Sequence, residues 1–181
     1  ENLQKVMVSK YLANFSIFQS IPDSWSIDQL FPVMPIGYHA EKPTRKAMIV
    51  DITCDSDGCI DRFVDSRDVK SVLDLHTPPL DQPYYLGFFL VGAYQEALSS
   101  EHNLFGAIHE AEVVVQPDGN WNISKLTKGD PIDELLECRN YDMKEIINSY
   151  KRQLKTAESE NLIKRGKSED ILRRLKKYST T

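Results

Sequence analysis

The period of the hydrophobic pattern changes once along these 181 residues, close to Gly129. Before this point, short apolar or alternating runs are separated by proline, glycine and aspartate, which is typical of β-strands. After it, apolar residues recur every three or four positions, as on one face of an amphipathic helix. This order predicts an α+β fold, with a β-domain over residues 1–129 and a helical appendage over residues 130–181. We expect the β-domain to be an antiparallel-rich sandwich or barrel.

Two strand pairs follow from the β-rich part. Residues 47–53 are rich in β-branched side chains and predict a strand, on which residues 60–64 pair back across the turn sequence 55–58. Residues 111–115 and 120–126 flank the sequence Pro-Asp-Gly, which favours a tight turn, and they predict a β-hairpin.

Three further segments have a strand-like pattern. Residues 14–21 alternate apolar and polar side chains, and the apolar run 84–91 predicts the best core strand. Residues 30–36 contain two prolines that cannot donate to a ladder, so we expect an edge strand or an extended connector there.

The helical part has recognisable starting residues. Asp130 is expected to cap a first helix, Asp142 a second and Ser168 a third, because short polar side chains accept hydrogen bonds from the first turn. With a connection near Gly166, residues 142–178 predict a helical hairpin.

Charge and composition exclude some classes of partner. The net charge of −5 gives no electrostatic support for nucleic acid, and the basic residues after position 163 are mixed with acidic ones, as on a solvated helix face. No apolar run is long enough to span a membrane. Three cysteines without a framework spacing favour a reducing compartment, and we expect a cytoplasmic protein. The chain begins at Glu1 without an initiator methionine or a signal peptide, and we expect this to be the cut edge of a longer protein.

The densest polar cluster covers residues 53–58, directly after a predicted strand. A calcium loop that starts at residue 53 would need a bidentate glutamate where Val64 stands, so this interpretation is rejected. Cys54 and Cys59 have no second pair of ligands, which makes a zinc site a weak interpretation.

Two interpretations of this cluster remain open. In the first, Cys54 acts as an acid or nucleophile beside a carboxylate anchor formed by Asp55 and Asp57. In the second, the segment is an ordinary aspartate-rich turn that carries a structural thiol.

A second candidate region begins at the apolar run 84–91, which passes through Gly92 into a predicted helix. The free N–H groups at such a junction can bind phosphate, and Tyr94 would add a hydroxyl; the alternative is an ordinary strand-to-helix turn with a packed Tyr94. His102 follows the same helix, and we expect it either to cap that helix or to line a binding pocket.

Four long motifs, taken together, carry a resemblance. Residues 14–32, 51–58, 84–95 and 102–105 resemble, in order and spacing, the bacterial biosynthetic arginine decarboxylases of the alanine-racemase-like type. The similarity covers residues 11–141 well and the final helices loosely. One departure is the sequence Gly37-Tyr38-His39, at a place where relatives commonly read His-Arg-Leu.

This resemblance implies an architecture of which only a part is present. The family has a (β/α)8 barrel, which binds pyridoxal phosphate through a lysine, followed by a β-domain and C-terminal helices. Nothing here predicts eight βα units, so we expect the cofactor-binding barrel to be absent and the isolated chain to be inactive. The resemblance also implies magnesium as a further cofactor, although we expect no metal site on this chain.

The resemblance assigns roles to four residues. Cys54 matches the cysteine that returns a proton to Cα after carbon dioxide leaves, and it acts across a dimer interface. Asp55 matches the carboxylate that faces the distal cation of the substrate, and Asp57 on the same turn is included with it. Tyr94 matches the tyrosine that reaches the cofactor.

The implied function is the conversion of arginine to agmatine and carbon dioxide for polyamine and spermidine biosynthesis, by a homo-oligomeric lyase, either a dimer or a tetramer. A decarboxylase of ornithine, lysine or diaminopimelate is the alternative within the class. An interaction module that kept a β-plus-helix fold and lost catalysis is the alternative outside it.

Overall fold

A computed structural model describes residues 8–164 and 166–179 of the chain, so Glu1 lies outside the described residues. Contacts along the chain divide it into two compact units, Glu1–Phe105 and Gly106–Thr181, hereafter unit 1 and unit 2. This division differs from the boundary predicted after residue 129, because it groups the predicted hairpin with the helices.

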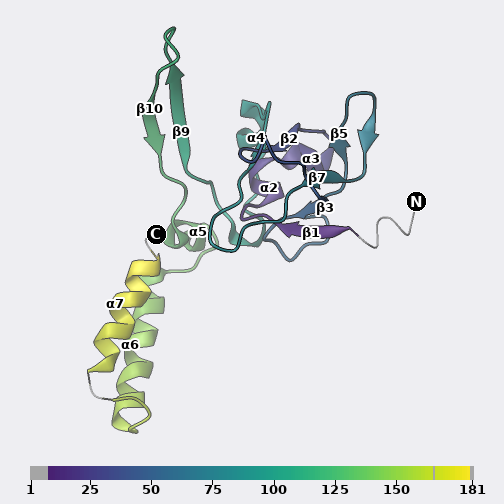
Figure 1. The fold of residues 1–181 in the computed structure, drawn as a ribbon. Helices are drawn as coiled ribbons and strands as arrows, with labels where there is room; N and C mark the ends of the chain where they lie inside the picture. The colour runs from purple at the N-terminus through teal and green to yellow at the C-terminus, as the bar shows by residue number, and fades with distance from the viewer. Residues whose placement is uncertain (1–7, 165, 180–181) are drawn as a thin grey trace. The chain divides into compact units, whose positions relative to one another are not determined.

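The central element of unit 1 is the strand β3 (Arg45–Val50). It pairs in parallel with β1 (Ser9–Leu12) on one side, and antiparallel with β7 (Leu73–Leu75) and β4 (Cys59–Ile60) on the other (Figure 1). The strand predicted at 47–53 is therefore confirmed, although it ends at Val50. The predicted return strand contributes only its first residue, Ile60, to β4.

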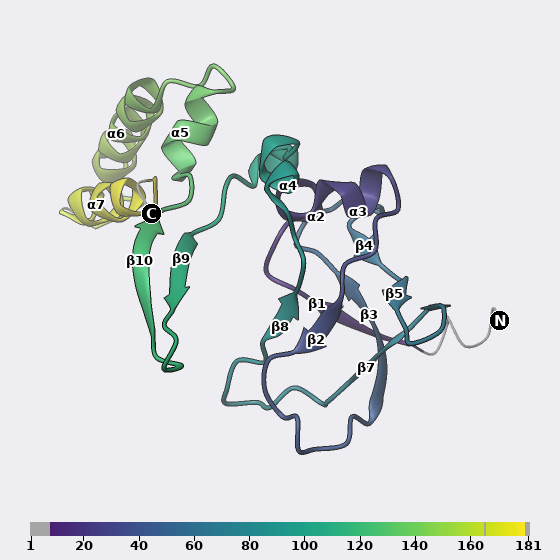
Figure 2. The same ribbon diagram turned by 90° about the horizontal axis from the view of Figure 1, so that it is seen from above.

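The core of unit 1 lies around this sheet. It is formed by the apolar side chains of Ile17, Ile21, Phe31, Ala47, Ile49, Ile60, Phe63, Leu73 and Leu75. Each of the larger side chains contributes about 1.5–3 kcal/mol to folding when fully buried. The short helices α2 (Ile17–Ser20), α3 (Pro22–Ser26) and α4 (Ala93–Ala97) gather on one side of the strands (Figure 2).

Two smaller strand pairs complete unit 1. The predicted edge segment contains β2 (Val33–Pro35), which pairs antiparallel with β8 (Leu86–Phe88), and β5 (Phe63–Val64) pairs antiparallel with β6 (Val69–Lys70). Within the described residues these pairs form no closed barrel with the main sheet.

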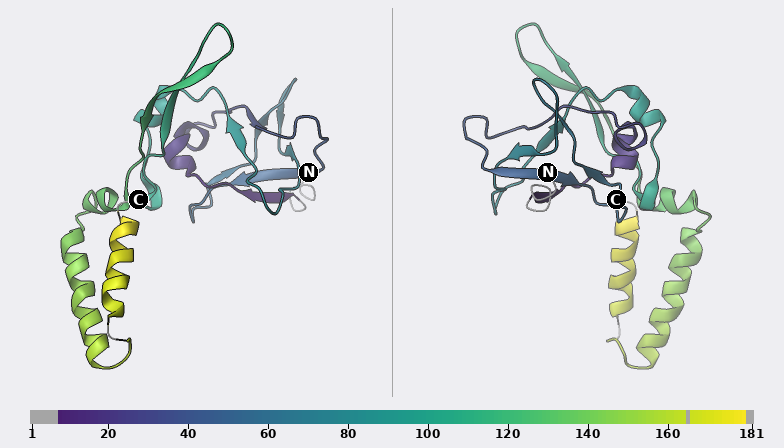
Figure 3. Two further views of the ribbon diagram at one scale, coloured as in Figure 1. Left: turned by 60° about the vertical axis from the view of Figure 1, so that its left-hand side comes forward. Right: turned by 90° about the vertical axis from the view of Figure 1, so that its right-hand side faces the viewer.

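Unit 2 contains the predicted hairpin and the predicted helices. The hairpin joins β9 (Glu110–Val115) to β10 (Trp121–Thr127), and its two strands run together to the tip (Figure 3). Gly119 has a φ of +85° at this tip, a conformation that favours glycine. The short helix α5 (Ile132–Glu137) precedes α6 (Met143–Ser159) and α7 (Lys167–Ser179), which pack together as the predicted helical hairpin.

Two strand predictions are wrong. Residues 14–21 contain α2 instead of a strand, because the Ser16 side chain caps the helix by accepting the N–H of Gln19 at 3.3 Å. Residues 84–91 contain only the three-residue β8, whose residues are half-buried, and Leu90 is 86% exposed with a φ of +59°. The apolar run 84–91 has neither a helical nor an alternating period. The observed strand is therefore shorter and more exposed than the apolar composition predicts.

Two of the three predicted caps also differ from the structure. Asp142 caps α6 as expected, with its carboxylate accepting the N–H of Lys144 at 2.7 Å. Asp130 instead accepts the N–H of Ala107 at 2.8 Å, so that Pro131 stands at the cap of α5. Ser168 lies inside α7, which begins one residue earlier.

Candidate functional site

The loop that follows β3 is held by a buried carboxylate. Asp51 is only 3% exposed, and its Oδ2 accepts the N–H of Ile17 at 2.9 Å. Its Oδ1 accepts the backbone N–H of Thr53 at 2.8 Å and the hydroxyl of Thr53 at 2.7 Å. A buried carboxylate is tolerated when it is hydrogen-bonded in this way, and these bonds fix the path of the chain into the turn.

The turn itself covers residues 55–58. The N–H of Gly58 donates to the Asp55 carbonyl at 3.1 Å, and the N–H of Asp57 donates to Asp55 Oδ1 at 2.9 Å. A Cβ atom at position 58 would lie 2.2 Å from Asp51 Oδ1, so the turn closes against Asp51 only with glycine. These hydrogen bonds confirm the predicted aspartate-rich turn.

Two ring side chains contact the two carboxylates of this turn, and a third packs against both rings. His102 Nε2 lies 3.2 Å from Asp55 Oδ2, and Trp25 Nε1 donates to Asp57 Oδ2 at 3.2 Å. Phe18 packs between the two, with ring centroids 4.4 Å from His102 and 5.1 Å from Trp25. We refer to Phe18, Trp25, Asp55, Asp57 and His102 as the aromatic–carboxylate ring.

Sequence patterns assign Asp51 no role and leave two roles open for His102. Asp51 was placed in a motif without a role, although its position at the end of a strand, just before the polar run, could have indicated one. His102 was given either a capping or a pocket role. The structure places it in a 3-10 turn, His102–Leu104, beside Asp55.

Cys54 lies at the exposed side of the turn. Its thiol, like those of Cys59 and Cys138, is not in a disulfide. It stands one residue from Asp55, whose side chain is 34% exposed and therefore reachable from solvent. A thiol and two oriented carboxylates thus share one short, fixed turn, an arrangement that can pass a proton and bind a cation.

Tyr94 is aimed outward by its buried neighbour in α4. Gln95 is 6% exposed, and it donates from Nε2 to Asp23 Oδ2 at 2.6 Å while its Oε1 accepts the Asp23 N–H at 3.1 Å. Tyr94 is 79% exposed, so the alternative of a packed tyrosine is wrong. Gly92 caps α4 as the sequence predicts, but this helix has only five residues. The packing of α4 on α2 joins it to the element that carries Phe18.

The departure at Gly37-Tyr38 contributes to a separate aromatic cluster. Tyr38 has a φ of +64°, and its ring centroid lies 5.7 Å from those of both His76 and Tyr84. Tyr11 donates its hydroxyl to the His76 carbonyl at 2.8 Å. Burial, with a smaller contribution from Tyr84, raises the pKa of Tyr11 above its ordinary value.

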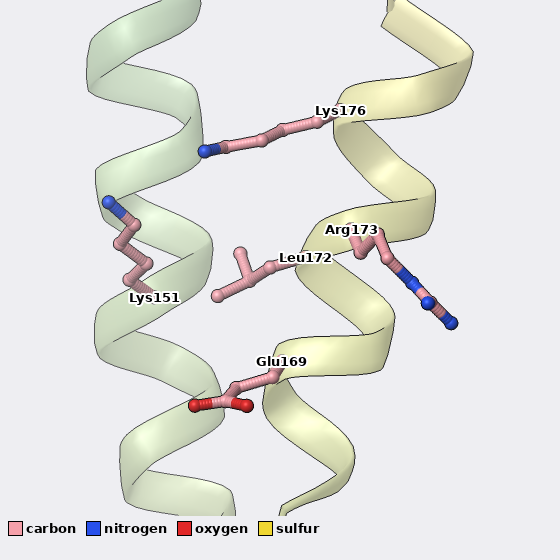
Figure 4. A pocket seen from close by; sticks show the side chains of 5 residues that line it. All are labelled: Lys151, Glu169, Leu172, Arg173 and Lys176. Carbon is pink, nitrogen blue, oxygen red and sulfur yellow. The ribbon is translucent and has the colours of Figure 1, made fainter.

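A shallow pocket of about 350 Å³ lies between α6 and α7 in unit 2. Figure 4 shows Lys176, Leu172 and Glu169 extending from α7 toward α6, while Lys151 lies along α6 and Arg173 points to the outer side. It contains none of the predicted site residues.

The part of the chain made up of residues 8–164 and 166–179 contains no group of three or more His, Cys, Asp or Glu side chains that could hold a metal ion. Nor does it contain a helix long and apolar enough to cross a membrane.

Two curated relatives of this chain are named as biosynthetic arginine decarboxylases. The chain is 52% identical over 142 residues to the biosynthetic arginine decarboxylase of Deinococcus radiodurans, covering 78% of this chain and 21% of that protein. It is 50% identical over 166 residues to biosynthetic arginine decarboxylase 1 of Synechocystis, covering 87% and 24%. The chain therefore spans about a fifth to a quarter of the length of these curated relatives. No protein-family model matches it.

A solved structure is similar over almost the whole chain. It is the crystal structure of the biosynthetic arginine decarboxylase of Campylobacter jejuni, with a TM-score of 0.81 and 38% sequence identity, covering 94% of this chain and 28% of that one. The similarity therefore extends from the sequence to the mixed α and β structure described above.

Proposed function

We propose that this chain supplies the proton donor and the substrate-binding carboxylates of a bacterial biosynthetic arginine decarboxylase. It is homologous to a segment that makes up about a quarter of the length of these lyases. The observation that carries the proposal is the turn at residues 54–57, where one thiol and two oriented carboxylates stand together. The product would be agmatine, for polyamine and spermidine synthesis.

Cys54 is the proposed acid of this site. When carbon dioxide leaves an amino acid, Cα must gain a proton to become the carbon of the amine product. An exposed thiol can give its proton to Cα and regain one from solvent, and it is short enough to act within a crowded site.

Asp55 is the proposed anchor for the distal cation of the substrate, with Asp57 beside it. A carboxylate has about four lone-pair positions and binds a guanidinium through paired, charge-assisted hydrogen bonds. Asp55 Oδ1 accepts one hydrogen bond within the chain, from the Asp57 N–H, and Oδ2 lies 3.2 Å from His102 Nε2. At least one lone pair on each oxygen remains for the guanidinium.

Pyridoxal phosphate, when bound, supplies the electron sink for decarboxylation. On this chain Tyr94 fits it, because its exposed hydroxyl can donate to a phosphate while Gln95 and Asp23 hold α4 in place. The cofactor would be bound mainly by a barrel outside this chain. Magnesium remains an expectation from the family resemblance alone.

The protonation and the cation contact are proposed to occur across the interface of a homodimer or a tetramer in the cytoplasm. Unit 1 exposes large apolar side chains that such an interface would cover, among them Phe89, Leu90, Val91, Tyr94 and Leu98. We expect the isolated chain to self-associate and to lack decarboxylase activity. Sedimentation of the 181-residue chain as a monomer at high concentration would contradict this expectation.

A chimera tests the proposed roles. This chain would replace the matching fifth of the Deinococcus radiodurans enzyme, and steady-state kinetics with arginine would be compared for three variants. Cys54→Ala should lower kcat far more than it weakens arginine binding, with Cys138→Ala, another exposed free thiol, as the matched control.

The same chimera separates the substrate and cofactor roles. Asp55→Ala should weaken the binding of arginine by about 1.5–3 kcal/mol per lost charge-assisted bond. It should weaken the binding of citrulline, whose side chain is neutral, much less. Tyr94→Phe should mainly loosen the cofactor, as followed by titration. Normal turnover in Cys54→Ala, or equal losses of arginine and citrulline in Asp55→Ala, would refute the assignment. Faster turnover of ornithine, lysine or diaminopimelate would favour the other substrates, and a folded but inactive chimera would favour the interaction module.

A further inference from the structure

We infer that His102 is a positioning residue for Asp55: it fixes the plane of the Asp55 carboxylate so that the free lone pairs face the cation of the substrate. This inference rests on the proposed function for its consequence in catalysis. Its structural part, the orientation of Asp55, can be tested without any activity.

The carboxylate of Asp55 is held at two points that lie on different segments. The Asp57 N–H binds Oδ1 at 2.9 Å from within the turn, whereas His102 Nε2 approaches Oδ2 at 3.2 Å from residues far along the chain. The local bond alone leaves the carboxylate free to tilt about its Cβ–Cγ bond. A ring nitrogen held 3.2 Å from the other oxygen opposes that tilt and sets the plane.

His102 is itself held by packing. Its ring packs against that of Phe18, with the centroids 4.4 Å apart and the planes tilted by 42°, and Phe18 is buried. The backbone near it is fixed as well, because the N–H of Ser100 donates to the Phe18 carbonyl at 2.9 Å. The donor therefore comes from a rigid support, which makes its direction useful for orienting a partner.

The chemistry at this position calls for a side chain with two properties. It must be flat, in order to pack against the Phe18 ring, and it must carry a donor at its far edge, in order to reach Asp55. Histidine combines both. Phenylalanine keeps only the ring and glutamine keeps only the donor, so these two substitutions separate the two properties.

The first experiment uses the chain as it is and measures hydrogen exchange of two neighbouring amides by NMR. The Asp57 N–H donates to the Asp55 side chain and the Gly58 N–H to the Asp55 backbone carbonyl, so the second serves as an internal control for the first. His102→Phe should accelerate exchange at Asp57 by roughly three- to tenfold relative to Gly58, a modest factor because both side chains are about a third exposed. His102→Gln should return the ratio to within about twofold of the original.

An unchanged ratio in His102→Phe would overturn the inference. So would equal acceleration at both amides, which would indicate general loosening of the loop, or a His102→Gln ratio no closer to the original than that of His102→Phe.

The second experiment uses the chimera with the Deinococcus radiodurans enzyme. His102→Phe should raise the KM for arginine by roughly three- to tenfold and leave kcat within about twofold, while His102→Gln should restore the KM. The inhibition constant of citrulline should change little in either variant. Equal effects on arginine and citrulline would overturn a positioning role toward the cation.

The two experiments fail independently. If the original chimera does not decarboxylate arginine, the proposed function fails, while amide exchange still decides whether His102 orients Asp55.

Discussion

Asp51 Oδ2 accepts the backbone N–H of Ile17 at 2.9 Å, and this bond joins two segments that are 34 residues apart in the sequence. Through it the first residue of α2 and the loop that carries Cys54 share one buried carboxylate. The stability of unit 1 and the geometry of the proposed site therefore depend on the same side chain.

Asp51→Asn should destabilise the chain by about 1–3 kcal/mol, because an amide can keep only some of the three bonds and turns a donor toward another donor. Urea unfolding followed by circular dichroism measures the change. Asp81→Asn, on an exposed loop, should be close to neutral. Equal stability of the two variants would contradict the anchoring role of Asp51.

Gly58→Ala should destabilise unit 1 by about 1–3 kcal/mol, since the added Cβ would overlap Asp51 Oδ1 and Thr53 Oγ1 and would force the turn open. Gly37→Ala is the matched control, because a Cβ there meets no atom within 4 Å. Thermal unfolding of both variants under the same conditions tests the difference. A Gly58→Ala variant as stable as Gly37→Ala would show that the turn can yield.

Gln95→Leu should destabilise the contact between α4 and α3, because it leaves the Asp23 carboxylate and the Asp23 N–H without their partner. A loss of about 1–3 kcal/mol is expected. Glu96→Ala, at the exposed neighbouring position of the same helix, should have a much smaller effect. Denaturant unfolding of the two variants measures the difference, and equal losses would assign the effect to the helix instead of the hydrogen bonds.

The pair between Lys46 and Asp74 joins β3 to β7 at directly opposed positions. The ordinary pKa of an aspartate side chain is 3.8, and the hydrogen bond from Lys46 holds the pKa of Asp74 below this value. The pKa of Asp74 is lower in the folded than in the unfolded chain. The pair's contribution to folding stability is therefore fully present above the unfolded pKa, and it is lost as the pH falls through the folded pKa.

Asp74→Asn should therefore cost about 0.5 kcal/mol at neutral pH, a small amount because the Asp74 side chain is 38% exposed. The difference from the original chain should shrink below a pH of about 4 and also at high salt. Unfolding free energies measured across this range test the claim, and a difference that persists at low pH would refute it.

Local sequence predicted the elements whose signals are local. The hairpin of β9 and β10 follows from its turn residues, β3 from its β-branched side chains, and α6 from the cap at Asp142. The candidate turn at Cys54 also came from residues close together in the sequence, whereas the family resemblance came from four separate motifs between residues 14 and 105.

What depended on distant residues was not predicted. The segment at 14–21 alternates like a strand, but Asp51 binds the first N–H of a helix there, and no local pattern contains that contact. Tyr94 was given a packed alternative, whereas the buried side of α4 belongs to Gln95 through Asp23. The contact of His102 with Asp55 depends on how α4 and the following turn pack on α2, which periodicity does not specify.

The aromatic–carboxylate ring also sets an order in which the site is assembled during synthesis. Residues 18, 25, 55 and 57 leave the ribosome well before residue 102, and contacts that close long loops form later than local ones. β1, β3, β4 and β7 all precede residue 76, so the main sheet can form while Asp55 still lacks its second donor. The carboxylate proposed to select the substrate is thus among the last groups of unit 1 to reach its final orientation. Premature termination shortly before His102 would yield a chain with this sheet and an unfinished specificity site.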